Sequence, residues 1–163
     1  MPARTPGTTT GTGTRTSEDV GWDRLDAPLR EALARAWAQR GDQVGELRGR
    51  RFVQTRTPGV AGSRWRARPP VPASVSTAFV HGGELHLAVA GPAGGAALSA
   101  RAADVEAAPA PDGTSLLLTA TWRGGSERGS TCLALGPGPA AAALRAEVVA
   151  ACAGPLPRGG RGS

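Results

Sequence analysis

The sequence of 163 residues contains no lysine, isoleucine, asparagine or tyrosine, and only two cysteines. Without lysine the chain cannot form a Schiff base with a substrate. It also cannot complete a standard phosphate-binding loop, which ends in Gly-Lys-Ser/Thr. Cys132 and Cys152 are too few and too far apart for a cysteine-based zinc site. They could form one disulfide, but we interpret them as two small buried residues in a reducing compartment.

Long apolar runs are also missing. The first 20 residues contain no apolar stretch typical of a signal peptide, and no segment reaches the roughly 20 apolar residues that a membrane helix needs. We therefore predict a soluble, cytoplasmic protein without a membrane span. With 40% hydrophobic residues, the chain can still bury a core, and its length suits one domain.

All 19 basic residues are arginine, and the formal net charge is +6. Residues 48–68 contain seven arginines and no acid; subtracting these seven from +6 leaves −1 for the rest of the chain. The pattern predicts two strands, roughly 50–57 and 63–68, joined by a turn at Pro58-Gly59. Alternation along the second strand would place three guanidinium groups on one face and Trp65 on the other.

Guanidinium groups that project together can bind phosphate or carboxylate in a bidentate manner. The candidate anion-binding residues are Arg51, Arg56, Arg64, Arg66 and Arg68. The alternative is a solvated strand face in a chain that uses arginine for every basic residue.

Residues 74–91 contain two alternating runs around Gly82-Gly83, a dipeptide that accepts the positive φ angles of a tight hairpin turn. A two-residue turn would pair Val80 with Leu85 and Ala78 with Leu87, on the face that we expect to be buried. We expect the opposite face to point toward solvent. It would carry Thr77, Phe79, His81, Glu84 and His86.

Three residues of that second face resemble a metal site. His81 would lie opposite Glu84, with His86 two residues further along. Two imidazoles and a carboxylate could hold iron or zinc with open positions. We prefer the interpretation of a solvated hairpin tip, because the spacing is not that of a helical His-Glu-x-x-His site.

Helical periodicity flanks the strands. Leucines and a tryptophan recur every four residues between Leu25 and Trp37, which predicts a helix over 24–40, and a second helix is predicted over 139–153. The first helix could dock a partner, but we expect it to pack on its own sheet. Strands are predicted between about 50 and 135 within one domain over 22–153. Residues 1–21, rich in Thr and Gly, and 154–163 are predicted to be disordered tails.

The predicted fold class is therefore α+β: an antiparallel β-barrel or sandwich of about seven strands with one helix at each end. Strands followed by a C-terminal helix, over roughly 48–153, resemble the pleckstrin-homology-like (PH-like) fold. The resemblance implies a bent sandwich closed by the last helix, and phosphoinositide contacts at Arg51, Arg56, Arg64 and Arg66. The competing architecture is one open antiparallel sheet with both helices on the same face.

No Gly-x-Ser-x-Gly elbow or pair of carboxylates indicates catalysis, so we expect no enzyme and no cofactor. The arginines with Phe52 and Trp65 leave nucleic-acid binding open, although no helix-turn-helix or zinc motif accompanies them. The sequence favours a small binding or adaptor module for an anionic ligand or an acidic protein partner. A metal-binding protein or metal-assisted enzyme using His81, Glu84 and His86, and a nucleic-acid-binding protein, are the alternatives.

Overall fold

The central hairpin forms with the predicted register. In the computed structural model, which describes residues 14–154, Ala78 pairs with Leu87 and Val80 with Leu85. Gly82 and Gly83 have φ angles of 57° and 77°, as a tight turn with two positive φ angles requires. This hairpin is the middle of a five-stranded antiparallel sheet, whose strands follow one another in sequence order. The strands are β1 (Thr16–Gly21), β2 (Arg51–Thr57), β3 (Ser74–His81), β4 (Glu84–Gly91) and β5 (Gly94–Arg101).

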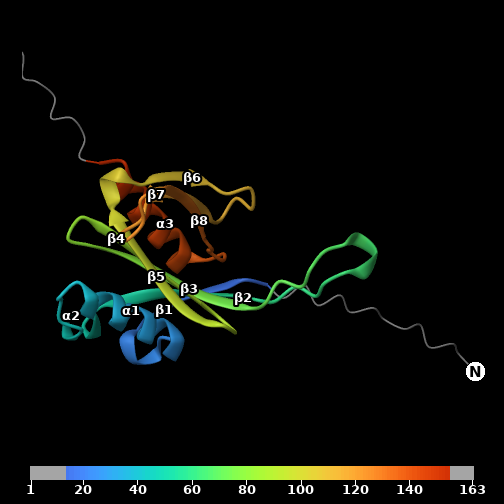
Figure 1. Ribbon diagram of the computed structural model, residues 1–163, viewed down its shortest axis with the longest axis horizontal. Helices are drawn as coiled ribbons and strands as arrows, with labels where there is room; N and C mark the ends of the chain where they lie inside the picture. Colours follow the sequence, from blue (N-terminus) through green and yellow to red (C-terminus); the bar gives the residue numbers. More distant parts are fainter. Residues whose placement is uncertain (1–13, 155–163) are drawn as a thin grey trace, which may run out of the picture.

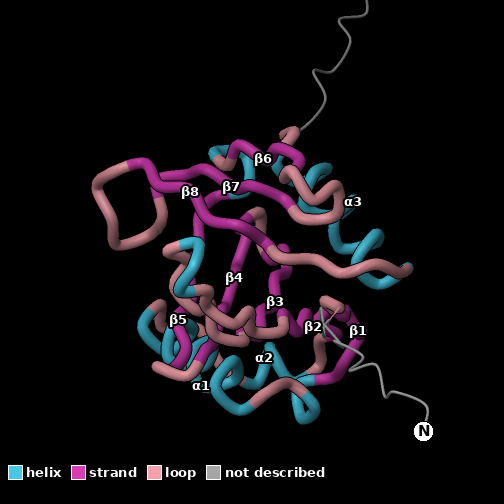
Figure 2. Tube along the Cα trace, turned by 90° about the vertical axis from the view of Figure 1, so that its right-hand side faces the viewer, coloured by secondary structure: helices cyan, strands magenta, loops and turns pink. Residues whose placement is uncertain are grey.

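A second, three-stranded antiparallel sheet lies against one face of the first (Figure 1). Its strands are β6 (Glu106–Pro109), β7 (Leu116–Thr121) and β8 (Arg128–Leu133). Helix α3 (Pro139–Cys152) packs beside this sheet (Figure 2). Its Leu144 and Val148 are buried in the core that the two sheets share with the helix. Leu85 and Leu87 enter the same core from β4.

Helix α1 (Ala27–Gln39) covers the opposite face of the five-stranded sheet. Pro28 occupies its first turn, and Leu29, Leu33 and Trp37 form its buried stripe, as the four-residue repeat predicted. The one-turn helix α2 (Gly45–Arg48) follows. Three short 3-10 helices complete the described elements: η1 (Trp22–Arg24), η2 (Arg64–Arg66) and η3 (Ala102–Asp104).

The prediction that the second face of the hairpin points to solvent is wrong. Thr77, Phe79 and His86 are 1%, 3% and 4% exposed. The reason is helix α1, whose Trp37 ring lies 5.8 Å from that of Phe79 and 4.8 Å from that of His86, centroid to centroid. The sheet is therefore buried on both faces over its central strands.

The architecture is α+β with two antiparallel sheets and with helices near both ends of the described chain. The single open sheet with both helices on one face is wrong, because α1 and α3 lie on opposite faces of the five-stranded sheet (Figure 1). Within residues 14–154 the strands do not close into a barrel, since β1 and β5 are the two edges of the larger sheet. None of the described helices is long and apolar enough to cross a membrane.

The predicted N-terminal tail is structured at its end. Residues 1–21 were expected to be disordered, but Thr16–Gly21 form strand β1 along β2. The backbone hydrogen bonds to β2 and burial of Val20 stabilise a segment whose own composition is poor in apolar residues. Thr14, Arg15 and Gly154 of the predicted tails are also described, and residues 1–13 and 155–163 lie outside the described residues. Both cysteines are free thiols, and neither is fully buried as expected, because Cys132 is exposed and Cys152 is only partly buried.

Candidate anion-binding site

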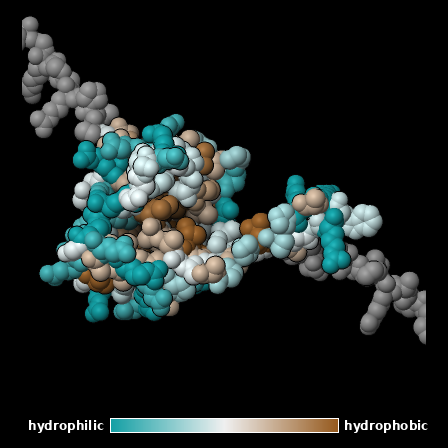
Figure 3. Space-filling model, viewed as in Figure 1, coloured by the Kyte–Doolittle hydropathy of each residue, from teal (hydrophilic) through white to brown (hydrophobic). Residues whose placement is uncertain are grey.

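Residues 58–73, called the arm below, connect β2 to β3 and extend away from both sheets (Figure 1). The two halves of the arm pair through backbone hydrogen bonds of 2.8 and 2.9 Å between Val60 and Val71. They approach so closely at Gly62 that a Cβ atom there would lie 2.8 Å from the backbone nitrogen of Pro70. The arm is therefore a closely paired hairpin, which stands clear of the body of the molecule in Figure 3.

The tip of the arm is a turn and not the predicted strand. The backbone N–H of Ser63 donates to the carbonyl of Arg68 (3.0 Å), and the N–H of Arg68 donates back to the carbonyl of Ser63 (3.2 Å). Between them Arg64–Arg66 form one turn of 3-10 helix, and Ala67 adopts left-handed backbone angles with φ 49° and ψ 33°. Alternation therefore does not apply to residues 63–68, because successive side chains of a 3-10 turn point about 120° apart.

Arg64, Arg66 and Arg68 are all exposed at this tip, together with Trp65, which is 99% exposed. Residues 58–73 contain no acid. Within the part of the chain that the structure describes, no carboxylate lies within 4.0 Å of these three guanidinium groups. The structure brings these three predicted anion-binding residues together in one turn.

The other two predicted anion-binding residues are engaged within the fold. Arg51 on β2 contacts Asp19 on β1, with 2.9 Å between Nε and Oδ1. Arg56 forms a bidentate pair with Asp26, which precedes α1, at 2.6 and 2.9 Å. These hydrogen bonds, which the guanidinium donates to Asp26, raise the pKa of Arg56 and outweigh the opposing effect of burial. Sequence reasoning missed both partners because they lie 30 or more residues away.

The three candidate metal ligands share one face, and His81 lies opposite Glu84 as predicted. The surroundings of Glu84, however, are two guanidinium groups, because Arg40 and Arg123 each bind one of its carboxylate oxygens. Burial disfavours ionisation of Glu84, but the hydrogen bonds and charges of these arginines outweigh it and lower its pKa. The carboxylate is therefore an ionised partner of two cations.

Each imidazole is also held by the fold. His81 Nδ1 lies 2.9 Å from Nη1 of Arg50. His86 is buried, with its ring stacked on Phe79 at 4.9 Å. Burial, followed by the charge of Arg40, lowers the pKa of His86 to about 4, so its ring is neutral at pH 7. Among residues 14–154 no group of three or more His, Cys, Asp and Glu side chains is arranged to hold a metal ion.

Comparisons with known proteins return no relative. No family model matches the sequence, and no curated protein or solved structure gives a significant match.

Proposed function

We propose that this chain is a small binding module that engages an anionic partner through the tip of its arm. The observation that supports the proposal is the cluster of Arg64, Arg66 and Arg68 on one exposed, hydrogen-bonded turn without a described carboxylate partner. Guanidinium groups are the side chains best suited to bidentate contacts with phosphate or carboxylate. Arg51 and Arg56 are not part of this site, because their guanidinium groups already bind Asp19 and Asp26.

The geometry of the turn also supports binding. A ligand that must order a flexible loop loses affinity to conformational entropy, whereas a turn already held by backbone hydrogen bonds avoids much of that cost. The two hydrogen bonds between Ser63 and Arg68 fix the backbone from which the guanidinium groups project. Only the long arginine side chains then need to be ordered when an anion binds.

A salt titration of binding to heparin, to a single-stranded oligonucleotide and to phosphatidylcholine vesicles containing phosphatidylglycerol tests the proposal. The test variant carries Arg64→Ala, Arg66→Ala and Arg68→Ala. Its matched control carries Arg24→Ala, Arg48→Ala and Arg101→Ala, which are also exposed and lie outside the arm. Both variants lower the formal net charge from +6 by three, to +3.

We expect the arm variant to lose at least about tenfold in affinity and to reduce the slope of log K against log salt by about 2, because three counterion-releasing contacts disappear. The control variant should retain most of the affinity and slope. Equal losses in both variants would mean that binding follows net charge and not the arm, and the proposal would fail. The polyanion that binds most tightly identifies the chemical source of the anion.

We further propose that the fold is a variant of the PH-like fold. The support is the order of elements: four strands β2–β5, three strands β6–β8 and the C-terminal helix α3. Strand β1 and helix α1 would then be additions before the shared elements. An experimental structure whose two sheets share the strand pairing and bend of that fold would support this relation, and a different sheet topology would contradict it.

A further inference from the structure

Trp65 differs from the other tryptophans of this chain in its exposure. Trp22 and Trp37 are buried in the core beneath α1, and Trp122 is partly buried, with Nε1 donating to the carbonyl of Gly129 at 3.0 Å. Trp65 is 99% exposed, so both faces of its indole ring are open to solvent. An uncovered aromatic ring on a turn that backbone hydrogen bonds hold in place is a platform on which another flat ring can stack.

The arginines of the tip surround this ring. Arg64 and Arg66 flank Trp65 in the single 3-10 turn, and successive side chains of such a turn point about 120° apart. The two guanidinium groups therefore project to either side of the ring and leave it uncovered. Arg68, whose backbone closes the turn with Ser63, adds a third guanidinium group.

A single strand of nucleic acid has the same alternation of groups. Each base of the strand is flanked by two phosphates, as Trp65 is flanked by two arginines. One base can therefore stack on the indole while the phosphates on its two sides are within reach of the guanidinium groups. Stacking tolerates any base, because every base has a π face, and contacts to phosphate carry no sequence information. The tip thus suits a single strand without a preferred sequence.

Other anionic partners use only part of the tip. A sulfated polysaccharide such as heparin contacts the guanidinium groups but has no aromatic ring for Trp65. An anionic bilayer could accept the indole, but the other exposed apolar residues of the arm, Val60 and Val71, lie between the tip and the body. Insertion deep enough to bury these valines would carry three guanidinium groups into the hydrocarbon core, which is costly. In a duplex the bases stack on one another, so they offer no face to the ring.

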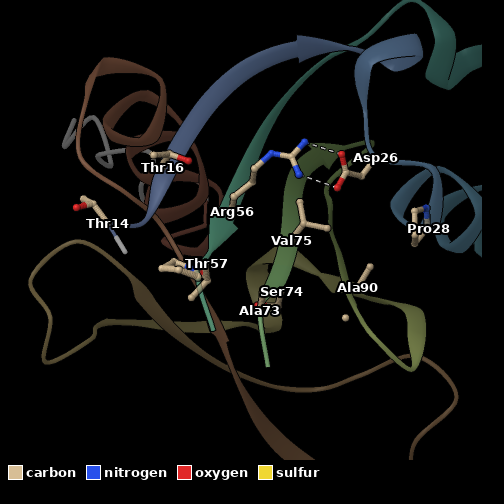
Figure 4. Close-up of a pocket in the computed structure, with 12 residues that line it drawn as sticks. Thr14, Thr16, Asp26, Pro28, Arg56, Thr57, Ala73, Ser74, Val75 and Ala90 are labelled. Atoms are coloured by element: carbon tan, nitrogen blue, oxygen red, sulfur yellow. Dashed lines mark hydrogen bonds and ion pairs between the residues drawn. The ribbon is translucent and has the colours of Figure 1, made fainter. Parts of the chain in front are cut away.

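The contact is confined to the tip. Residues 57–63 and 69–73 contain no charged side chain. The next arginine toward the body, Arg56, is bound to Asp26 on the wall of a groove at the base of the arm, as Figure 4 shows. It is therefore not free to extend the path of a strand. Three guanidinium groups and one ring correspond to a site of about three nucleotides, which is shorter than the roughly 4–16 nucleotides that one OB-fold domain covers.

We propose that the tip of the arm binds single-stranded nucleic acid, with one base stacked on Trp65 and the adjacent phosphates held by Arg64, Arg66 and Arg68. This inference rests on the proposed anion site and names its ligand. The arginines supply the part of the affinity that depends on salt, and Trp65 supplies a part that requires a base. The two contributions can therefore be measured separately.

The test compares two strands that differ only in their bases. Fluorescence anisotropy measures binding of the full chain to an end-labelled thymidine dodecamer and to an abasic dodecamer with the same phosphates, over a range of salt concentrations. We expect Trp65→Ala to weaken binding of the thymidine strand between about fivefold and about a hundredfold. It should leave the salt slope, and binding of the abasic strand and of heparin, unchanged. A uridine ribo-dodecamer, measured in parallel, shows whether DNA or RNA is the tighter ligand.

Two further substitutions of Trp65 separate stacking from the burial of apolar area. Trp65→Phe keeps a flat ring and should retain most of the affinity for the thymidine strand. Trp65→Leu keeps apolar area without a ring and should bind as weakly as Trp65→Ala. Leu117→Ala, which truncates an exposed apolar residue of β7, is the matched control and should bind as the wild type does. Circular dichroism and thermal unfolding show that each variant is folded.

Equal binding of the thymidine and abasic strands, or full affinity of Trp65→Ala for the thymidine strand, would overturn this proposal. If the triple-arginine variant then still loses heparin binding, the anion site stands and only its assignment to nucleic acid fails. Weaker binding of Trp65→Ala to phosphatidylglycerol vesicles, with no change toward the thymidine strand, would assign the tip to a bilayer instead. Absence of polyanion binding by the wild type, or full affinity in the triple-arginine variant, would overturn both proposals.

Discussion

The buried imidazole of His86 predicts that the fold loses stability in mild acid. The ring lies between Trp37 and Phe79, and its pKa falls from an ordinary value of 6.5 to about 4. Between these two values the unfolded chain binds a proton that the folded chain does not, so stability decreases as the pH falls. Each pH unit below 6.5 costs about 1.4 kcal/mol, and the expected loss between about pH 7.5 and 5 is about 2 kcal/mol.

Between about pH 7.5 and 5, the expected loss of stability comes from His86 and not from the carboxylates with lowered pKa values. Glu84 and Asp112 have lowered pKa values, so their contribution is complete above their ordinary values of 4.5 and 3.8 and is lost only in stronger acid. The free energy of unfolding is measured by urea titration, with circular dichroism as the signal, at several pH values and constant ionic strength. His86→Phe should remove the decrease, because a phenyl ring packs in the same place without titrating.

His81→Phe is the matched control, since it removes the other histidine, whose side chain is 42% exposed. We expect it to leave the decrease of about 2 kcal/mol in place. If His86→Phe unfolds with the same pH dependence as the wild type, or if the wild type shows no decrease above about pH 5, the argument from burial is wrong.

Two further substitutions test the arm and the half-buried carboxylate of Glu84. Gly62→Ala places a Cβ atom against the backbone of Pro70 and should loosen the pairing of the arm. We therefore expect trypsin to cleave at the tip several-fold faster, while the thermal unfolding midpoint of the protein is unchanged. The control Gly49→Ala, at a position with open space around it, should behave as wild type. Glu84→Gln leaves two guanidinium groups without their shared partner and should cost about 2 kcal/mol in urea titrations at neutral pH, less than for a fully buried pair because the side chain is 19% exposed. In the control Glu106→Gln, which removes an exposed carboxylate, the free energy of unfolding should change by no more than about 0.5 kcal/mol. Equal losses of stability in Glu84→Gln and Glu106→Gln would contradict the partial burial of Glu84.

The hairpin and the two long helices were predictable because local patterns determine them. Alternating residues around Gly82-Gly83 fix the register, and the four-residue repeat of α1 fixes its buried stripe. The same patterns could not show that α1 covers the second face of the hairpin. A sheet face composed of Thr77, His81 and His86 looks polar in sequence, and only the packing of a distant helix makes it an interior surface.

The arginine-rich segment was predictable in composition but not in arrangement. Residues 64–68 alternate as a strand would, yet the pairing of Ser63 with Arg68 closes a turn, and Ala67 takes a left-handed conformation that an alternating pattern does not indicate. The partners of Arg51 and Arg56 were hidden for a different reason. Asp19 lies in a segment too poor in apolar residues to predict a strand, and Asp26 lies 30 residues before Arg56.

The three arginines of the tip differ from Arg51 and Arg56 in their distance from the carboxylates of the body. Arg51 and Arg56 lie on β2, within reach of Asp19 on the neighbouring strand and Asp26 before α1. Six residues of extended chain between Thr57 and Ser63 span roughly 20 Å, more than twice the Debye length of about 8 Å at physiological ionic strength, and the arginines of the tip lie beyond Ser63. The acids of the body that carry the compensating charge therefore have little influence on the tip. Three guanidinium groups on one turn repel one another there, and a ligand of opposite charge relieves that repulsion as well as adding its own contacts.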